Sequence, residues 1–172
     1  MFFKELSQEN IVANEIKKNH KILVVMGNPP YSVSSSNKSE WIIDLMKDYK
    51  RDLEEKNIQP LDDDYIKFIR FAQWKIDQNG YGVLGFITNN RFIDGRIHRE
   101  MRKNLLKTFN QIYILNLHGS SRKELSKYKD ENVFAIQQGV TISLFIKTND
   151  ETRQVNYYEI FGTREHKYNF LY

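Results

Sequence analysis

The sequence predicts an α/β fold whose sheet is parallel at least in its first part, because short apolar runs alternate with segments of helical periodicity. Five runs are rich in β-branched and aromatic residues and have the length of strands. They comprise residues 21–26, 81–88, 112–117, 140–146 and 155–160. Between the first two runs, apolar residues recur at the spacing of one helix face.

The N-terminal part is predicted to form a polar helix over 7–19 and then a strand over 21–26. This strand is uniformly apolar, which is typical of a strand buried on both faces. Gly27-Asn28-Pro29-Pro30 ends it, because the two prolines have no backbone N–H to donate. A loop rich in Ser and Asn, 32–39, is expected to be mobile, and a helix is expected over 41–56.

A second helix is predicted to begin at Asp62-Asp63-Asp64, since acidic residues are favoured in the first turn. Its apolar face comprises Tyr65, Ile66, Phe68, Ile69, Ala72 and Ile76. Gly80 ends the helix before the strand over 81–88. A basic helix follows over 95–108, and a long polar loop separates the strands over 112–117 and 140–146.

The composition of the 172 residues excludes several classes of protein. Without Cys there are no disulfides, no zinc–thiolate sites and no thiol nucleophiles. The four His residues lack metal-ligand spacing, so no metal site is predicted. The N-terminus does not resemble a signal peptide, and no run reaches the length of a membrane span. We therefore expect a soluble, cytoplasmic protein that does not contact membranes.

Positive charge is concentrated in one stretch, because ten basic and only three acidic residues lie between Arg91 and Lys129. Two interpretations remain open, a solvated helix face and a surface that faces phosphates. The second interpretation gives five candidate DNA contacts, which are Arg91, Arg96, Arg99, Arg102 and Lys103. The same stretch also contains Lys107, Arg122, Lys123, Lys127 and Lys129.

The most informative residues are Asn28-Pro29-Pro30-Tyr31, which directly follow the first predicted strand. In open α/β sheets, ligands bind at the carboxyl ends of strands, so these residues stand where a site is expected. The alternative is a turn that ends the strand and carries a surface tyrosine.

Asn-Pro-Pro-Tyr resembles the fourth motif of amino-methyltransferases that use S-adenosylmethionine. Residues 64–75, 82–93 and 133–142 resemble the fifth, sixth and eighth motifs of that family, in the same order. Within the family, the chain is most similar to the gamma-type N6-adenine DNA methyltransferases of restriction–modification systems. The tail over 161–171 is similar to large single-polypeptide enzymes that join nuclease, helicase and methylase.

This resemblance implies the C-terminal half of a Rossmann-like methyltransferase fold, with a mixed, mostly parallel sheet and flanking helices. Residues 1–150 would form the half of the catalytic domain that binds the target base. Residues 151–172 would begin the connection to a further domain. The main cofactor loop, which is rich in glycine, precedes the fourth motif in the family. We therefore expect a fragment that starts just before this motif and is inactive in isolation, from either a truncated gene or expression of a part.

The resemblance also implies roles for individual residues. Asn28 and the carbonyl of Pro29 would accept the two N6 hydrogens of adenine, and Pro30 would stiffen their loop. Tyr31 and Phe134 would stack on a base flipped out of the duplex. Asn28 and Phe68 would contact the cofactor, S-adenosylmethionine. For Phe134 and Phe68, an ordinary core position is the alternative.

The expected partners are double-stranded DNA and the remainder of the parent polypeptide. Self-association through an exposed sheet edge is also expected, unless the N-terminal helix shields that edge. Two rival functions remain at this stage. One is an amino-methyltransferase that acts on rRNA guanine or on a protein glutamine. The other is a non-catalytic remnant that only binds DNA.

Overall fold

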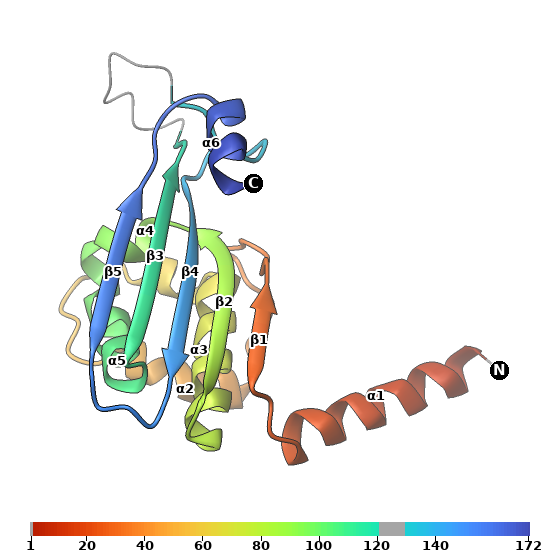
Figure 1. The fold of residues 1–172 in the computed structure, drawn as a ribbon. Helices are drawn as coiled ribbons and strands as arrows, with labels where there is room; N and C mark the ends of the chain where they lie inside the picture. The colour runs from red at the N-terminus through yellow and green to blue at the C-terminus, as the bar shows by residue number, and fades with distance from the viewer. Residues whose placement is uncertain (1, 121–129) are drawn as a thin grey trace.

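The computed structural model describes residues 2–120 and 130–172 as a five-stranded mixed sheet with helices on one face (Figure 1). The strands are β1 (Val24–Gly27), β2 (Gly82–Asn89), β3 (Gln111–His118), β4 (Val140–Lys147) and β5 (Gln154–Glu159). Their order in the sheet is β1-β2-β4-β3-β5. Only β4 is antiparallel to its neighbours, so the predicted mixed, mostly parallel sheet is confirmed.

The helices that cover this face pack on the sheet through one hydrophobic core, to which the strands contribute Leu84, Phe86 and Phe145. The principal helices are α1 (Phe2–Asn19), α2 (Glu40–Lys50), α3 (Asp64–Asn79), α5 (Arg99–Thr108) and α6 (Arg164–Leu171). Short helical segments are η1 (Gln59–Asp62), α4 (Arg91–Asp94) and η2 (Arg96–His98). The helix predicted over 95–108 therefore begins as a 3-10 turn after Gly95.

Strand β1 differs from its prediction as a strand buried on both faces. It pairs only with β2, so it is an edge strand of the described sheet, with Val24 57% and Met26 79% exposed. Helix α1 extends away from the sheet and leaves this edge uncovered (Figure 1). Shielding by α1 is therefore not observed, and self-association through the edge stays a prediction.

Helix α2 ends at Lys50, earlier than predicted, because Arg51 is extended and Asp52 takes a left-handed conformation. Its start is fixed by Ser39, whose side chain accepts a hydrogen bond from the backbone of Ile42. Trp41, in the first turn of α2, is exposed and packs edge-on against Trp74, with ring centroids 5.0 Å apart.

The C-terminal part continues the same folded unit. Strand β5 pairs in parallel with β3, and α6 lies at the carboxyl end of the sheet (Figure 1). Thr163 caps α6, because its hydroxyl accepts from the backbone of His166 at 3.2 Å. The predicted connection of residues 151–172 to a further domain stays a prediction.

A buried polar cluster joins three helices beneath the sheet. The Tyr49 hydroxyl of α2 donates to Gln73 Oε1 of α3 at 2.7 Å. The Gln73 amide in turn donates to the carbonyl of Asn104 and to Thr108 Oγ1, both on α5. Tyr49 is fully buried, and burial raises the pKa of its hydroxyl, so this group acts only as a neutral donor.

We expect Tyr49→Phe to lower the free energy of unfolding by about 1–3 kcal/mol, because Gln73 Oε1 is left buried without a donor. Urea denaturation monitored by circular dichroism measures the change. Tyr81→Phe, at an exposed position, is the matched control and should change stability by less than about 0.5 kcal/mol. Equal effects of the two substitutions would contradict the assigned role of the cluster.

Candidate active site at the carboxyl ends of the strands

The motif Asn28-Pro29-Pro30-Tyr31 leaves the carboxyl end of β1, as predicted. Pro29 is buried, whereas Asn28 and Pro30 are exposed. Within residues 2–120 and 130–172, the Asn28 amide has no hydrogen-bond partner from the protein. Its oxygen is therefore available to accept hydrogen bonds from a ligand.

Tyr31 lies on the wall of a pocket of about 290 Å³, which we call the Tyr31 pocket. The pocket is lined by Tyr31, Val33, Pro60, Asp63, Tyr65, Asn89, Arg91, His98 and Gln138. These residues come from the loop after β1, from η1 and the start of α3, from the end of β2 with α4 and η2, and from the segment before β4. The fold thus brings together four segments that are distant in the sequence.

The Tyr31 ring is held edge-on against Tyr65, with ring centroids 5.9 Å apart. Burial and the nearby carboxylate of Asp63 raise the pKa of Tyr31 to about 12. The hydroxyl is buried and makes no hydrogen bond to another described residue. Tyr31 therefore presents an uncharged aromatic ring at physiological pH.

The loop over 32–39, which we expected to be mobile, is tied to α3 by hydrogen bonds. Ser32 N donates to Asp63 Oδ1 at 2.7 Å, and Asp64 N donates to the carbonyl of Ser32 at 3.2 Å. Lys67, itself buried, donates to Ser35 Oγ and to the carbonyl of Asn37. Asp63 is the N-cap residue of α3, but its carboxylate accepts its hydrogen bond from the loop. Burial raises the pKa of this carboxyl group. These bonds fix the chain that follows Tyr31.

The opposite wall of the Tyr31 pocket is built from the end of β2 and the segment before β4. Asn89 Oδ1 accepts from the backbone of Arg91 at 3.0 Å. The backbone of Asn90 donates to the carbonyl of Gly139 at 2.9 Å, and its side chain donates to Asn116 Oδ1. The Asn90 side chain lies so close to Gly139 that a β-carbon there would be 2.6 Å from Asn90 Nδ2.

Two predicted aromatic residues lie outside the Tyr31 pocket. Phe134 is half-buried and packs against a second hydrophobic cluster that contains Val133 and Val140. It is not brought into contact with Tyr31. Phe68 is 41% exposed on α3, so its interpretation as an ordinary core residue is wrong. The roles predicted for both residues stay predictions.

His98 is a pocket residue that the sequence analysis did not identify. It is buried, and burial together with the positive charges of Arg102 and Arg91 lowers its pKa to about 4. Asp63, Tyr65, Asn89 and Gln138 were also missed. Of these residues, Asn89 could have been found from the sequence, because it directly follows the strand predicted over 81–88, at the same edge of the sheet as Asn28.

The sequence profile of the Eco57I restriction-modification methylase family matches residues 2–122, which is more than half of the chain. The chain belongs to this family. A comparison with curated protein sequences found no match.

Solved structures of restriction-modification enzymes are similar to this methylase chain. The ATP-dependent Type ISP enzyme LlaBIII bound to DNA is 34% identical, with a TM-score of 0.84 over 94% of this chain. A nuclease-deletion mutant of the Type ISP enzyme LlaGI, in complex with a DNA substrate mimic, is 27% identical, with a TM-score of 0.85 over 95%. The DrdV–DNA complex is 25% identical, with a TM-score of 0.81 over 95%. The chain spans only 12% of the LlaBIII chain and 17% of each of the other two.

The five basic residues predicted to contact DNA have different environments in the methylase. Arg91 lines the Tyr31 pocket, and Arg102 donates to the carbonyls of Phe92 and Gly95, which makes it partly structural. The remaining three form ion pairs on the surface. These pairs are Arg96–Glu55 at 3.1 Å, Arg99–Glu55 at 2.5 Å and Lys103–Glu100 at 3.1 Å. DNA contact by these residues stays a prediction.

The basic cluster continues along α5 to Lys107 and also includes Arg153, which directly precedes β5. Both residues line one hollow with Arg99, Arg102 and Lys103. Arg153 donates to the carbonyls of Leu106 and Lys107, at the end of α5. The other basic residues of this stretch, Arg122, Lys123, Lys127 and Lys129, lie outside the described residues.

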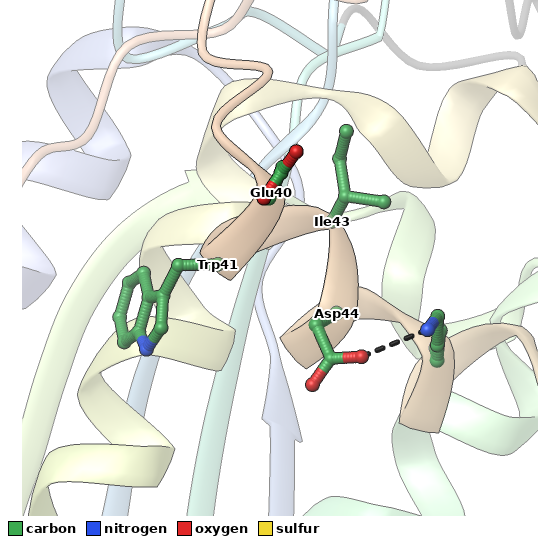
Figure 2. A pocket seen from close by; sticks show the side chains of 5 residues that line it. Glu40, Trp41, Ile43 and Asp44 are labelled. Atoms are coloured by element: carbon green, nitrogen blue, oxygen red, sulfur yellow. Dashed lines mark hydrogen bonds and ion pairs between the residues drawn. The ribbon is translucent and has the colours of Figure 1, made fainter.

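Another hollow lies on the outer face of α2 and contains none of the predicted site residues (Figure 2). It is lined by Trp41, Ile43 and the exposed ion pair Asp44–Lys47, together with Glu40. In residues 2–120 and 130–172, no cluster of three or more His, Asp or Glu residues is arranged to hold a metal ion. No helix in these ranges is long and apolar enough to cross a membrane.

Membership of a methylase family implies S-adenosylmethionine as the methyl donor. Two exposed side chains have the chemistry that this cofactor requires. Phe68 offers an aromatic ring on α3, and Asn28 offers, at the end of β1, an amide without a partner among the described residues. An aromatic ring suits the adenine of the cofactor, because such rings stack on nucleobases.

The depressed pKa of His98 makes the stability of the fold depend on pH. An unfolded histidine takes up a proton near pH 6.5, whereas folded His98 does so only near 4. The unfolded state therefore binds more protons within this window, and stability falls as the pH falls through it. From pH 7 to pH 5 the loss attributable to His98 is about 2 kcal/mol.

We expect His98→Gln to remove this part of the pH dependence, measured by urea unfolding at pH 7 and pH 5. His20→Gln, at an exposed position, should leave the dependence unchanged. If His98→Gln and the native chain lose the same stability between the two pH values, His98 is not buried in its neutral form.

Proposed function

We propose that this chain forms the target-base half of a DNA methyltransferase site that methylates N6 of an adenine flipped out of the duplex. One observation carries the proposal. Asn28-Pro29-Pro30-Tyr31 lies at the carboxyl end of β1, with an exposed amide at Asn28 and the ring of Tyr31 on the wall of a pocket. At about 290 Å³, the pocket is at the small end of the range for ligand sites, as suits a single base.

The chemistry explains why two acceptors are needed. The exocyclic amine of adenine is conjugated with its ring and is a poor nucleophile. Asn28 Oδ1 and the carbonyl of Pro29 would each accept one N6 hydrogen, which draws the nitrogen toward tetrahedral geometry and frees its lone pair. Placement of these neutral acceptors matters more than their pKa values. S-adenosylmethionine supplies the electrophilic methyl group when bound, with Phe68 and Asn28 contributing to its site.

Base flipping costs a few kcal/mol, which stacking in the site can offset. Stacking of a base on an aromatic ring contributes about 1–3 kcal/mol. Tyr31, held in place by Tyr65, would supply this contact, and Phe134 would supply a second one from the segment before β4. Arg91, an exposed residue that lines the same pocket, would bind a phosphate near the flipped nucleotide.

The comparisons support DNA as the substrate over rRNA guanine or a protein glutamine. LlaBIII, LlaGI and DrdV are restriction-modification enzymes whose structures contain DNA or a DNA mimic. Because the chain spans a small part of each, we propose that its parent polypeptide carries the remaining cofactor site and the domains that read the sequence. The alternative is a non-catalytic remnant that only binds DNA. Methylation by the complete methylase, and its loss in Asn28→Ala, distinguishes the two functions.

Asn28→Ala in the complete methylase should abolish methylation, because one of the two acceptors for N6 is lost. We expect kcat to fall by far more than tenfold, which corresponds to about 1.4 kcal/mol. Asn57→Ala, in an exposed loop, is the matched control. Retention of more than a tenth of the native kcat by Asn28→Ala, with unchanged DNA affinity, would refute the assigned role.

Tyr31→Ala should weaken base flipping, whereas Tyr31→Phe should be mild, because stacking uses the ring and the hydroxyl makes no hydrogen bond within the described chain. A 2-aminopurine at the target position measures flipping by its fluorescence. We expect the alanine variant to lose stabilisation of about 1–3 kcal/mol. If the phenylalanine variant is equally impaired, the hydroxyl contributes and the stacking account is wrong.

A further inference from the structure

The segment over 130–138 contains Gln138, which lines the Tyr31 pocket, and Phe134, which lines a separate hollow together with Arg164. This segment contains no helix or strand. A segment of this kind needs side-chain partners to hold one conformation, because its own backbone groups make no regular hydrogen bonds. The partners come from α6, which follows the last strand and lies outside the residues matched by the family profile.

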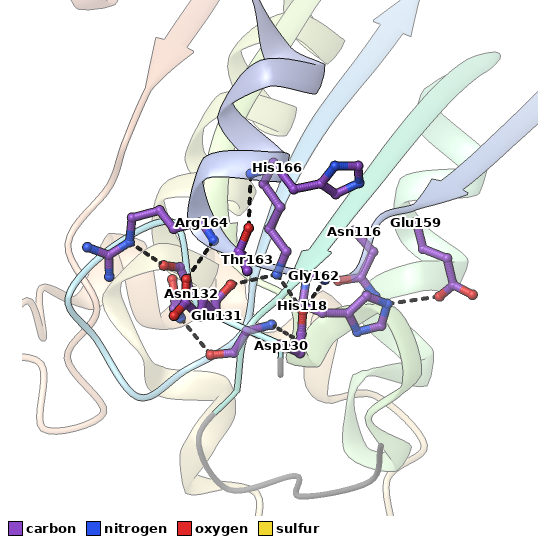
Figure 3. A network of polar contacts seen from close by, with 12 residues as sticks. Asn116, His118, Asp130, Glu131, Asn132, Glu159, Gly162, Thr163, Arg164 and His166 are labelled. Carbon is purple, nitrogen blue, oxygen red and sulfur yellow. Dashed lines mark hydrogen bonds and ion pairs between the residues drawn. The ribbon is translucent and has the colours of Figure 1, made fainter. Parts of the chain in front are cut away.

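Side chains of α6 bind four consecutive carbonyl groups of this segment. Figure 3 shows Arg164 of α6 beside Glu131 and Asn132 of the segment. Lys167 Nζ donates to Glu131 O at 2.6 Å, and Tyr168 donates through its hydroxyl to Val133 O at 2.7 Å. Arg164 donates through Nε to Asn132 O at 2.8 Å and through Nη2 to Phe134 O at 3.3 Å. The three donors are spaced so that they lie on one face of the helix.

A buried ion pair fixes how α6 sits on the segment. Lys167 is completely buried, and its ammonium lies 2.6 Å from Asp130 Oδ1. The same carboxylate accepts from the backbone of Gly119 at 2.8 Å and of Gly162 at 3.1 Å. A buried ion pair contributes little to stability unless its remaining groups are satisfied, and its best-supported use is to specify one packing arrangement. Here the carboxylate is fully engaged, and the segment is held in one register on α6.

We propose that α6 is a positioning element of the methylation site, which sets Phe134 for contact with the flipped base. Arg164 is its central positioning residue, because its Nη2 donates to the carbonyl of Phe134 itself. This inference rests on the proposed function. It assigns to the C-terminal helix a part in catalysis, in addition to any connection it makes to a further domain.

The experiment uses the complete methylase with 2-aminopurine at the target position of its DNA. Arg164→Gln and Tyr168→Phe each remove hydrogen bonds to the segment and leave the buried ion pair intact. We expect Tyr168→Phe to lower the fluorescence enhancement and kcat by about fivefold, the effect of one hydrogen bond, and Arg164→Gln, which removes two hydrogen bonds, to lower both by more. DNA affinity and the melting temperature should change little. Asn169→Ala, on an exposed position of α6, is the matched control and should behave as the native enzyme.

A double-mutant cycle separates positioning from general stability. If α6 acts through Phe134, Arg164→Gln should have no further effect on fluorescence or kcat in a Phe134→Ala background. Additive effects of Arg164→Gln and Phe134→Ala would overturn the inference. It would also be overturned if both α6 variants gave native fluorescence while Phe134→Ala lowered the fluorescence. If Phe134→Ala and Tyr31→Ala both methylate normally, the proposed function itself fails.

Discussion

Strand β4 runs antiparallel to both of its neighbours, and this reversal places its first residue at the edge where the other strands end. In the register, Val140 of β4 lies opposite Asn89 of β2 and His118 of β3. The segment that precedes β4 therefore arrives at the same edge of the sheet as Asn28, with β2 between β4 and β1. A parallel β4 of the same length would begin at the opposite edge, about 25 Å away. The site thus depends on the direction of one strand.

Around that edge, the loops are held by polar groups that are far apart in the sequence. The Ser-rich loop is bound to Asp63 and Lys67 on α3, and the segment before β4 is bound to α6. Backbone groups that strands and helices leave unpaired find partners in side chains of the helices. Helices α3 and α6 therefore hold the loops at this end of the sheet, in addition to their other contacts in the fold.

Much of this was predictable from the sequence, and the rest was not, for physical reasons. Apolar runs locate all five strands to within a few residues, because alternation and β-branching reflect local burial. The motif that begins at Asn28 located the site because it follows a strand. By contrast, the exposure of β1 depends on which strand lies beside it, and no local pattern records its neighbours.

Three further features that the sequence did not predict have similar causes. Helix α6 is short and has few apolar residues facing the fold, so its stability comes from tertiary contacts and its own sequence carries little helical signal. The pocket roles of Asp63 and His98 arise from contacts with residues on other elements. Phe68 fits the apolar periodicity of α3 but is exposed. Periodicity indicates which face of a helix is apolar, but the width of the buried part of that face depends on the neighbouring elements.

The contact between Gly139 and the Asn90 side chain has a consequence for how enzymes with this fold can diverge. The Asn90 side chain is held by its hydrogen bond to Asn116, so moving it aside would break this bond. A side chain at position 139 is therefore excluded by steric overlap with Asn90. At Gly27, in contrast, nothing lies within 4 Å of an added β-carbon. The junction of β2 and β4 therefore retains its geometry as neighbouring residues change, because a side chain at position 139 would displace Asn90.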